Sequence, residues 1–163
     1  MAEQKHYSAA CAQTTGRVIS ARILPDLDIL DTIEEICMEY GIRYGQISTC
    51  IGSLRSFSCN FVSTPVPAGE HGYTTHLEMA GAFSILSGMG LVSPADEEGH
   101  LNTHLHFVVS GQNDAVYGGH VERGTRTLTT TDLFITELTG IEIHRAKDPQ
   151  TGAVTTTFKE AKD

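Results

Sequence analysis

Four of the eight histidines of the chain lie in one stretch, HLNTHLHFVVSGQNDAVYGGH, which spans residues 100–120. Within it, His104 and His106 form an H-x-H pair, and side chains two residues apart on a β-strand project from the same face. His120 ends a later Gly-Gly-His segment. Because neutral imidazole is the commonest metal ligand among the side chains, these residues could bind a transition metal such as zinc.

Whether the three imidazoles meet depends on the register of one hairpin. A turn at GQND folds the segment AVYGGH back beside the H-x-H strand. With a loop of residues 112–114, Gly111 faces Ala115. In that register His120 lies opposite His106 on the same face, whereas a loop of two or four residues sends His120 to the other face. The two glycines before His120 complicate the count, because glycines in strands often mark bulges that re-aim the next side chain.

Three imidazoles that leave a fourth position open form the ligand set of a catalytic zinc, whereas structural zinc sites have four ligands and are rich in cysteine. No cysteine lies in residues 100–120, so the sequence favours the open site. The alternative is a set of ordinary polar sheet residues, because H-x-H pairs also occur by chance on exposed strand faces. We expect His100, which follows a loop, to be a bystander. We expect His76 to be a surface residue, although it could contribute from a neighbouring strand.

The rest of the sequence predicts a mostly antiparallel sheet covered by one helix. GRVISARIL, residues 16–24, alternates as a half-buried strand. Asp28 then caps a helix whose apolar residues recur at helical spacing, with Glu34 turned outward and Gly41 as its stop. Downstream, short apolar and β-branched runs broken by Gly, Pro, Asn and Asp are typical of antiparallel strands. The C-terminal segment adds one short strand.

Size and composition indicate one globular domain. The chain has 163 residues, which is enough for a single core. It contains neither the apolar core of a signal peptide nor an apolar run long enough to span a bilayer, so we expect a cytoplasmic location and no membrane partner. The four cysteines form no C-x-x-C pair, and free thiols are expected.

The charge balance argues against nucleic acid as the main partner. The formal net charge is −9, from 11 Lys and Arg against 20 Asp and Glu. Proteins that bind duplex DNA neutralise phosphates with Lys and Arg, and the densest basic cluster here is ERGTR, with Arg123 and Arg126. An oligomer could still gather these arginines on one face.

The order of motifs resembles the plant-and-prokaryote-conserved domain, called PPC or PCC. The chain presents IGSLRSF, LEMAGAFSILSGMGLV, HLHFVVSGQNDAVYGGHVERG and TTTDLFI in that order, and the hallmark of the family is an H-x-H strand followed by Gly-Gly-His. The resemblance covers residues 16–145. It implies an α/β sandwich (α+β), with a mainly antiparallel sheet packed on one long helix, assembled as a homotrimer. The expected organisation is a leader at 1–15, a PPC-like domain at 16–147 and an extension at 148–163.

The resemblance also implies a metal site and a ligand site. The histidines that match the metal ligands of bacterial relatives are His104, His106 and His120. The arginine of the G-S-L-R segment is Arg55, which would fix an anionic ligand in a cleft between subunits, or alternatively form a surface salt bridge. The chain departs from the family in having Ser84 where an acidic residue is common and Asp132 where a glutamate is usual. It also lacks the R-G-R-P hook through which plant members bind AT-rich DNA.

The sequence leaves three functions open. The first is a metal site, with zinc or another divalent transition metal, that binds or transforms a small anionic metabolite. The second is a DNA-binding regulator, as the family is commonly described, although the acidic charge disfavours it. The third is a metabolite-sensing scaffold without turnover. No residue is assigned an acid or base role, and the sequence does not decide whether the protein is an enzyme.

Overall fold

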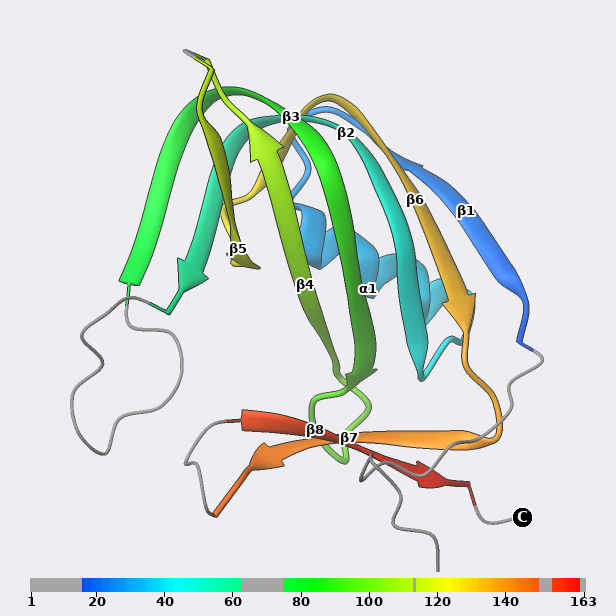
Figure 1. The fold of residues 1–163 in the computed structure, drawn as a ribbon. Coiled ribbons are helices and arrows are strands. Elements are labelled where there is room, and N and C mark those ends of the chain that lie inside the picture. Colours follow the sequence, from blue (N-terminus) through cyan, green and yellow to red (C-terminus); the bar gives the residue numbers. More distant parts are fainter. Residues whose placement is uncertain (1–15, 63–74, 113, 150–153, 162–163) are drawn as a thin grey trace, which may run out of the picture.

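The computed structural model describes residues 16–62, 75–112, 114–149 and 154–161 (Figure 1). The expected leader at 1–15 lies outside the described residues. Within them, the elements in chain order are β1 (Val18–Ile23), α1 (Ile29–Glu39), β2 (Gly45–Phe61), β3 (Thr75–Pro94), β4 (Leu101–Ser110), β5 (Val116–Val121), β6 (Arg126–Glu137), β7 (Ile141–Lys147) and β8 (Val154–Glu160). No helix in this part of the chain has the length and apolar character needed to cross a bilayer.

The mostly antiparallel sheet is confirmed. Six strands pair in the order β1-β6-β2-β3-β4-β5, and every pairing is antiparallel. The last strand, β5, also pairs with β2, so β2 to β5 curl into a closed group. The two long strands β2 and β3 bend along their length, which gives the sheet a concave side and a convex side (Figure 1).

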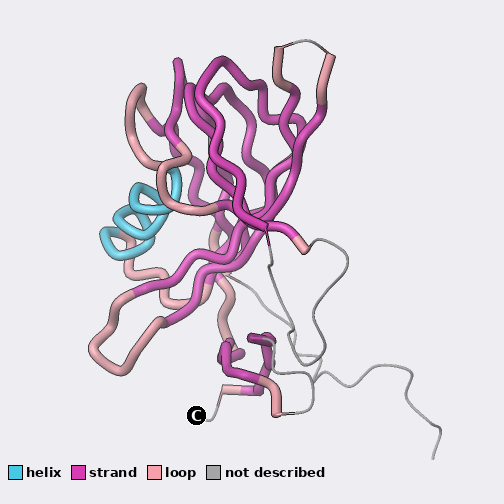
Figure 2. Tube along the Cα trace, turned by 90° about the vertical axis from the view of Figure 1, so that its left-hand side faces the viewer, coloured by secondary structure: helices cyan, strands magenta, loops and turns pink. Residues whose placement is uncertain are grey.

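The helix α1 packs on the concave side of the sheet, and Figure 2 shows it on one side only. Its start is as expected, because the Asp28 carboxylate accepts hydrogen bonds from the N–H groups of Leu30 and Asp31. Its end is also as expected, because Gly41 adopts φ 66° just after it. The implied long helix is wrong, since α1 has 11 residues. The cap and the left-handed glycine bound it at both ends.

The outward orientation expected for Glu34 is also wrong. Glu34 is buried, and its carboxylate accepts a hydrogen bond of 3.1 Å from the Thr103 N–H at the start of β4. It also forms an ion pair of 2.7 Å with Arg123. These two partners come from distant parts of the sequence, so helical periodicity alone could not reveal them.

The core lies between α1 and the concave side of the sheet. On β4, the alternating residues Leu105, Phe107 and Val109 are buried in this core. Their neighbours His104 and His106 therefore project from the convex side. Cys37, Cys50 and Cys59 are buried and free, as expected, whereas Cys11 lies outside the described residues.

The last two strands, β7 and β8, form a separate two-stranded ribbon. The ribbon crosses the end of the sheet near the C-terminal end of β3 and the start of β4 (Figure 1). Ile143 on β7 is only 2% exposed, and β7 lies in contact with β3 of the sheet. Arg145 lies two residues further along the same face and is partly buried, whereas His144 between them is exposed.

Candidate metal centre

The hairpin of β4 and β5 has the register on which the meeting of the histidines depends. The Gly111 N–H donates to the Ala115 carbonyl across a distance of 2.9 Å. His106 is the direct partner of His120, and the β4–β5 pairing runs from this pair to Ser110 and Val116 without a register shift. The predicted register is confirmed. Asn113, in the middle of the loop, lies outside the described residues.

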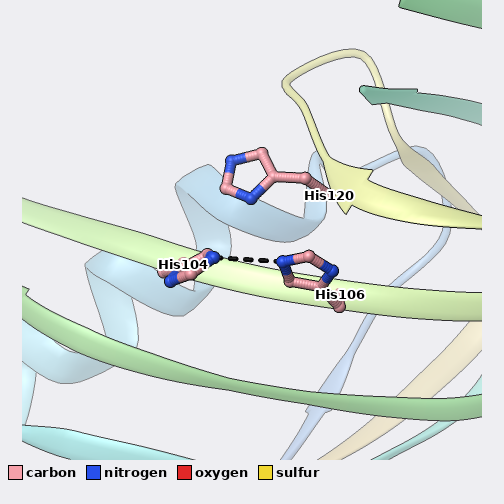
Figure 3. A group of neighbouring side chains, drawn as sticks. All are labelled: His104, His106 and His120. Carbon is pink, nitrogen blue, oxygen red and sulfur yellow. Dashed lines mark hydrogen bonds between the residues drawn. The ribbon is translucent and has the colours of Figure 1, made fainter. Parts of the chain in front are cut away.

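The three imidazoles converge on one point of the convex side. Figure 3 shows His104 and His106 side by side on β4, with His120 leaning over them from β5. The ring centroids are 4.8–5.3 Å apart, and one nitrogen from each ring lies within 4.8 Å of the other two. The Nε2 atoms of His104 and His106 are 3.0 Å apart. All three side chains come from one chain.

The surroundings keep the three rings neutral. Burial lowers the pKa of His104 and of His120 to about 4, and the neighbouring imidazoles and Arg145 add to the effect. Burial, followed by the charge of Arg145, also lowers the pKa of His106. A neutral imidazole has a free lone pair on one ring nitrogen, so the cluster can ligate a cation at neutral pH.

A polar chain of side chains flanks His120. The Glu122 carboxylate lies 3.7 Å from His120 Nε2 and accepts a 2.5 Å hydrogen bond from the Asn60 amide. Asn60 in turn bonds to His76 Nδ1 at 2.7 Å, and His76 also contacts Glu78. His76 is exposed, as expected, and its described partners are Asn60 and Glu78. Asn60 is the strand partner of both His120 and His76, so the curl that brings β5 onto β2 builds this chain.

Glycines let the strands that carry the triad approach one another closely. A Cβ on Gly119 would lie 2.7 Å from the Asn60 carbonyl oxygen, so the residue before His120 must be glycine for β5 to pair with β2. A Cβ on Gly90 of β3 would overlap the His104 carbonyl oxygen. The β4–β5 pairing passes through Gly118 and Gly119 without a register shift. These glycines therefore allow close packing and do not form a bulge.

The structure places the remaining candidate residues away from the triad. Arg55 forms an exposed ion pair with Asp26 within one chain. Asp132 forms an exposed pair with Arg22, through two hydrogen bonds of 2.6 and 2.9 Å. His100 bonds to Asp96 at 2.6 Å.

The sequence matches the model of the Plants and Prokaryotes Conserved (PCC) domain over residues 11–139. The chain belongs to the PCC domain family. All three triad histidines fall within the matched residues, as do Asn60 and Glu122. Arg145 and the β7–β8 ribbon lie beyond them.

Solved structures share the fold of this PCC domain. A plant- and prokaryote-conserved protein from Pyrococcus horikoshii is 24% identical, with a TM-score of 0.74 and coverage of 94% of this chain and 99% of that one. A metal-containing protein from Archaeoglobus fulgidus is 27% identical over the same shares of the two chains, with a TM-score of 0.73. A protein from Bacteroides thetaiotaomicron described as a candidate DNA-binding protein is 20% identical, with a TM-score of 0.71 and coverage of 90% and 95%.

One curated relative also matches this PCC domain. It is the bifunctional protein GlmU of a Synechococcus strain, which is 23% identical over 136 residues. The match covers 83% of this chain but only 20% of that protein. The chain thus spans about a fifth of the length of this relative.

Analysis of the sequence missed Arg145, Asn60 and Glu122 as neighbours of the triad. Arg145 carried a readable signal, since IEIHR alternates Ile141, Ile143 and Arg145 on one face, which puts a charged residue on an apolar face. Asn60 and Glu122 carried none, because their proximity depends on the pairing of β2 with β5.

Proposed function

We propose that this PCC-domain protein is a homotrimer that holds a divalent transition metal at His104, His106 and His120 and there binds or transforms a small anionic metabolite. Zinc is the first candidate for the ion. The observation that carries the proposal is the convergence of three neutral imidazoles, from two paired strands, on one point.

The residues fit such an ion in both donor type and spacing. Zinc accepts imidazole nitrogens at about 2.0–2.1 Å in a tetrahedral arrangement, which puts two ligand nitrogens about 3.3 Å apart. The Nε2 atoms of His104 and His106 are 3.0 Å apart, and the ligand nitrogens of all three residues lie within 4.8 Å of one another, so the rings would have to draw together around the ion. Three imidazoles without a cysteine also match the open ligand set that leaves room for a substrate. A metal in this fold is also supported by the relative from Archaeoglobus fulgidus, which is described as metal-containing.

When bound, the ion would act as a Lewis acid on an oxygen of the ligand or lower the pKa of a bound water. The protein side chains would orient the ligating imidazole and accept a proton. Glu122, whose carboxylate is fixed by the Asn60 amide, would help to orient the His120 ring by electrostatic attraction across 3.7 Å, as the outer partners of a ligating imidazole do. Glu122 is also the carboxylate that lies near enough to accept a proton from a molecule beside His120.

The test is the metal content of purified protein after growth with added zinc. We expect about one zinc per chain in the wild type and less than about a third of that in His106→Ala and His120→Ala, because each loses one of three ligands. The matched control is His144→Ala, whose exposed imidazole bonds to Glu142 and belongs to no described group of metal-ligating side chains. Equal zinc content in the wild type and in both triad variants would falsify the proposal.

DNA binding is a weaker candidate that rests on the description of relatives such as the one from Bacteroides thetaiotaomicron. The arginines on which it depends are already engaged. Arg123 pairs with Asp31 and Glu34, and Arg126 donates to the Asp26 carbonyl. Binding to a labelled duplex at about 50 mM salt that weakens steeply as salt rises would support this function over the first. A sensing scaffold would instead hold the metal and a metabolite without converting it.

A further inference from the structure

We infer that Arg145 is a specificity-determining residue that binds the carboxylate of the small molecule held at the triad. The inference rests on the proposed function and deepens it. It names the ligand class as a small carboxylate that carries a second oxygen donor for the ion.

The ribbon places Arg145 beside the triad. Ile143 is buried, β7 lies in contact with β3, and Arg145 projects from the same face of β7 as Ile143, two residues further along. The Arg145 Nη1 donates a 2.8 Å hydrogen bond to the side-chain oxygen of Asn102. Asn102 precedes His104 by two residues on β4, so the two side chains share one face of the strand. The guanidinium is therefore held next to the imidazoles by a contact from the same strand.

The hydrogen bond to Asn102 engages only Nη1 of the guanidinium. Arg145 Nε is buried and has no hydrogen-bond partner among the described residues. A buried N–H without an acceptor costs free energy, and a ligand oxygen would satisfy it. The guanidinium is a planar fork whose paired N–H donors match the two oxygens of a carboxylate. This chemistry favours a carboxylate over an uncharged group.

The charge of Arg145 is unfavourable for a site that holds only a cation. A guanidinium held beside the three imidazoles by Asn102 would repel a divalent ion bound there. The same charge becomes favourable when an anion binds to the ion and the guanidinium together. None of Asp96, Glu97 and Glu98, the acidic residues of the loop between β3 and β4, is a described partner of Arg145. The positive charge is thus in place for an anionic ligand.

The experiment measures binding of glycolate and of its uncharged isostere glycolamide to zinc-loaded protein by calorimetry. We expect the wild type to bind glycolate more tightly than glycolamide. In Arg145→Gln the affinity for glycolate should fall by about ten- to a hundredfold, the usual effect of losing a hydrogen bond to a charged group, and that for glycolamide should change little. Arg145→Lys should recover part of the loss, because it keeps the charge without the fork.

Zinc affinity in the same variants separates a ligand-binding role from a structural one. Removing a positive charge beside a cation should leave zinc affinity unchanged or raise it, whereas a damaged site would lower both affinities. The matched control is Arg22→Gln, on the opposite edge of the sheet, which should behave as the wild type. A second variant, Asn102→Asp, keeps Arg145 but pairs its guanidinium with a carboxylate. Because the positive charge is then offset, this variant should also bind glycolate more weakly.

The outcomes are distinguishable. A wild type without zinc overturns the proposed function, and the inference is overturned with it. One zinc per chain with equal glycolate affinity in the wild type and Arg145→Gln overturns the role of Arg145 alone. If the zinc-loaded wild type binds no glycolate, the role of Arg145 is overturned as well.

Discussion

At the scale of the residue, Glu34 links the helix to the strand that carries two of the triad histidines. Its carboxylate is held between the Thr103 N–H and the guanidinium of Arg123. Burial raises the pKa of this carboxyl above its ordinary 4.5, and Arg123 opposes the rise. The folded protein therefore accommodates the ionised group at a cost that Arg123 only partly offsets.

The variant Glu34→Gln tests the sign of this effect. When the pKa of a carboxyl is higher in the folded state than in the unfolded state, its contribution to stability is fully present below the unfolded-state pKa. That contribution is lost as the pH rises through the folded-state pKa. The free energy of unfolding of the wild type minus that of Glu34→Gln should therefore decrease between about pH 4 and about pH 7. Urea denaturation at the two pH values measures it, with the exposed Glu35→Gln as control. An increase over this interval would contradict the assignment.

At the scale of the element, the close approach of β3 to β4 depends on glycine. Gly90 pairs with Leu105, and a side chain at Gly90 would overlap the carbonyl oxygen of His104. Backbone cannot rotate away as a side chain can, so the strands would have to separate beside a triad histidine. The position of His104 thus depends on the close approach of β3 as well as on β4, the strand that carries it.

We expect Gly90→Ala to lower the free energy of unfolding by about 1–3 kcal/mol, as overpacking usually does. Zinc affinity should fall as well, because the strand that carries His104 is displaced. The control is Ser87→Ala, a small exposed change on the same strand. Thermal denaturation and zinc titration measure the two effects, and unchanged stability would show that β3 moves away without penalty.

At the scale of the whole molecule, the convex side of the sheet exposes large apolar side chains. Ile51 and Met89 are each 60% exposed, and Leu86 and Phe134 also lie open. Exposed apolar patches on this scale are typical of protein interfaces. This side also carries the triad, because Met89 is the strand partner of His106. The proposed homotrimer would cover these residues.

The trimer predicts a mass of about 53 kDa in light scattering, three times the 17.6 kDa of one chain. Ile51→Glu should shift the protein towards the monomer, because a charge buried in the interface would be unpaired. Met38→Glu is the matched control, since Met38 is 55% exposed on the helix, away from the convex side. A monomeric wild type would rule out the trimer.

Local patterns in the sequence determined much of the fold and the convergence of the triad. The two-residue period placed His104 and His106 on one face, the length of the loop set the register of His120, and Asp28 marked the start of the helix. Each of these depends on residues close together in the chain, where strand and helix geometry leave few choices. Resemblance to the PCC family added the identity of the domain.

Only the tertiary structure decided which distant residues surround the triad. The curl of β5 onto β2 brings Asn60 to His120, and the packing of the ribbon beside β3 and β4 brings Arg145 to Asn102. The burial of Glu34 likewise depends on Arg123, far along the chain. Such contacts follow from how whole elements pack, and local periodicity carries no information about that packing.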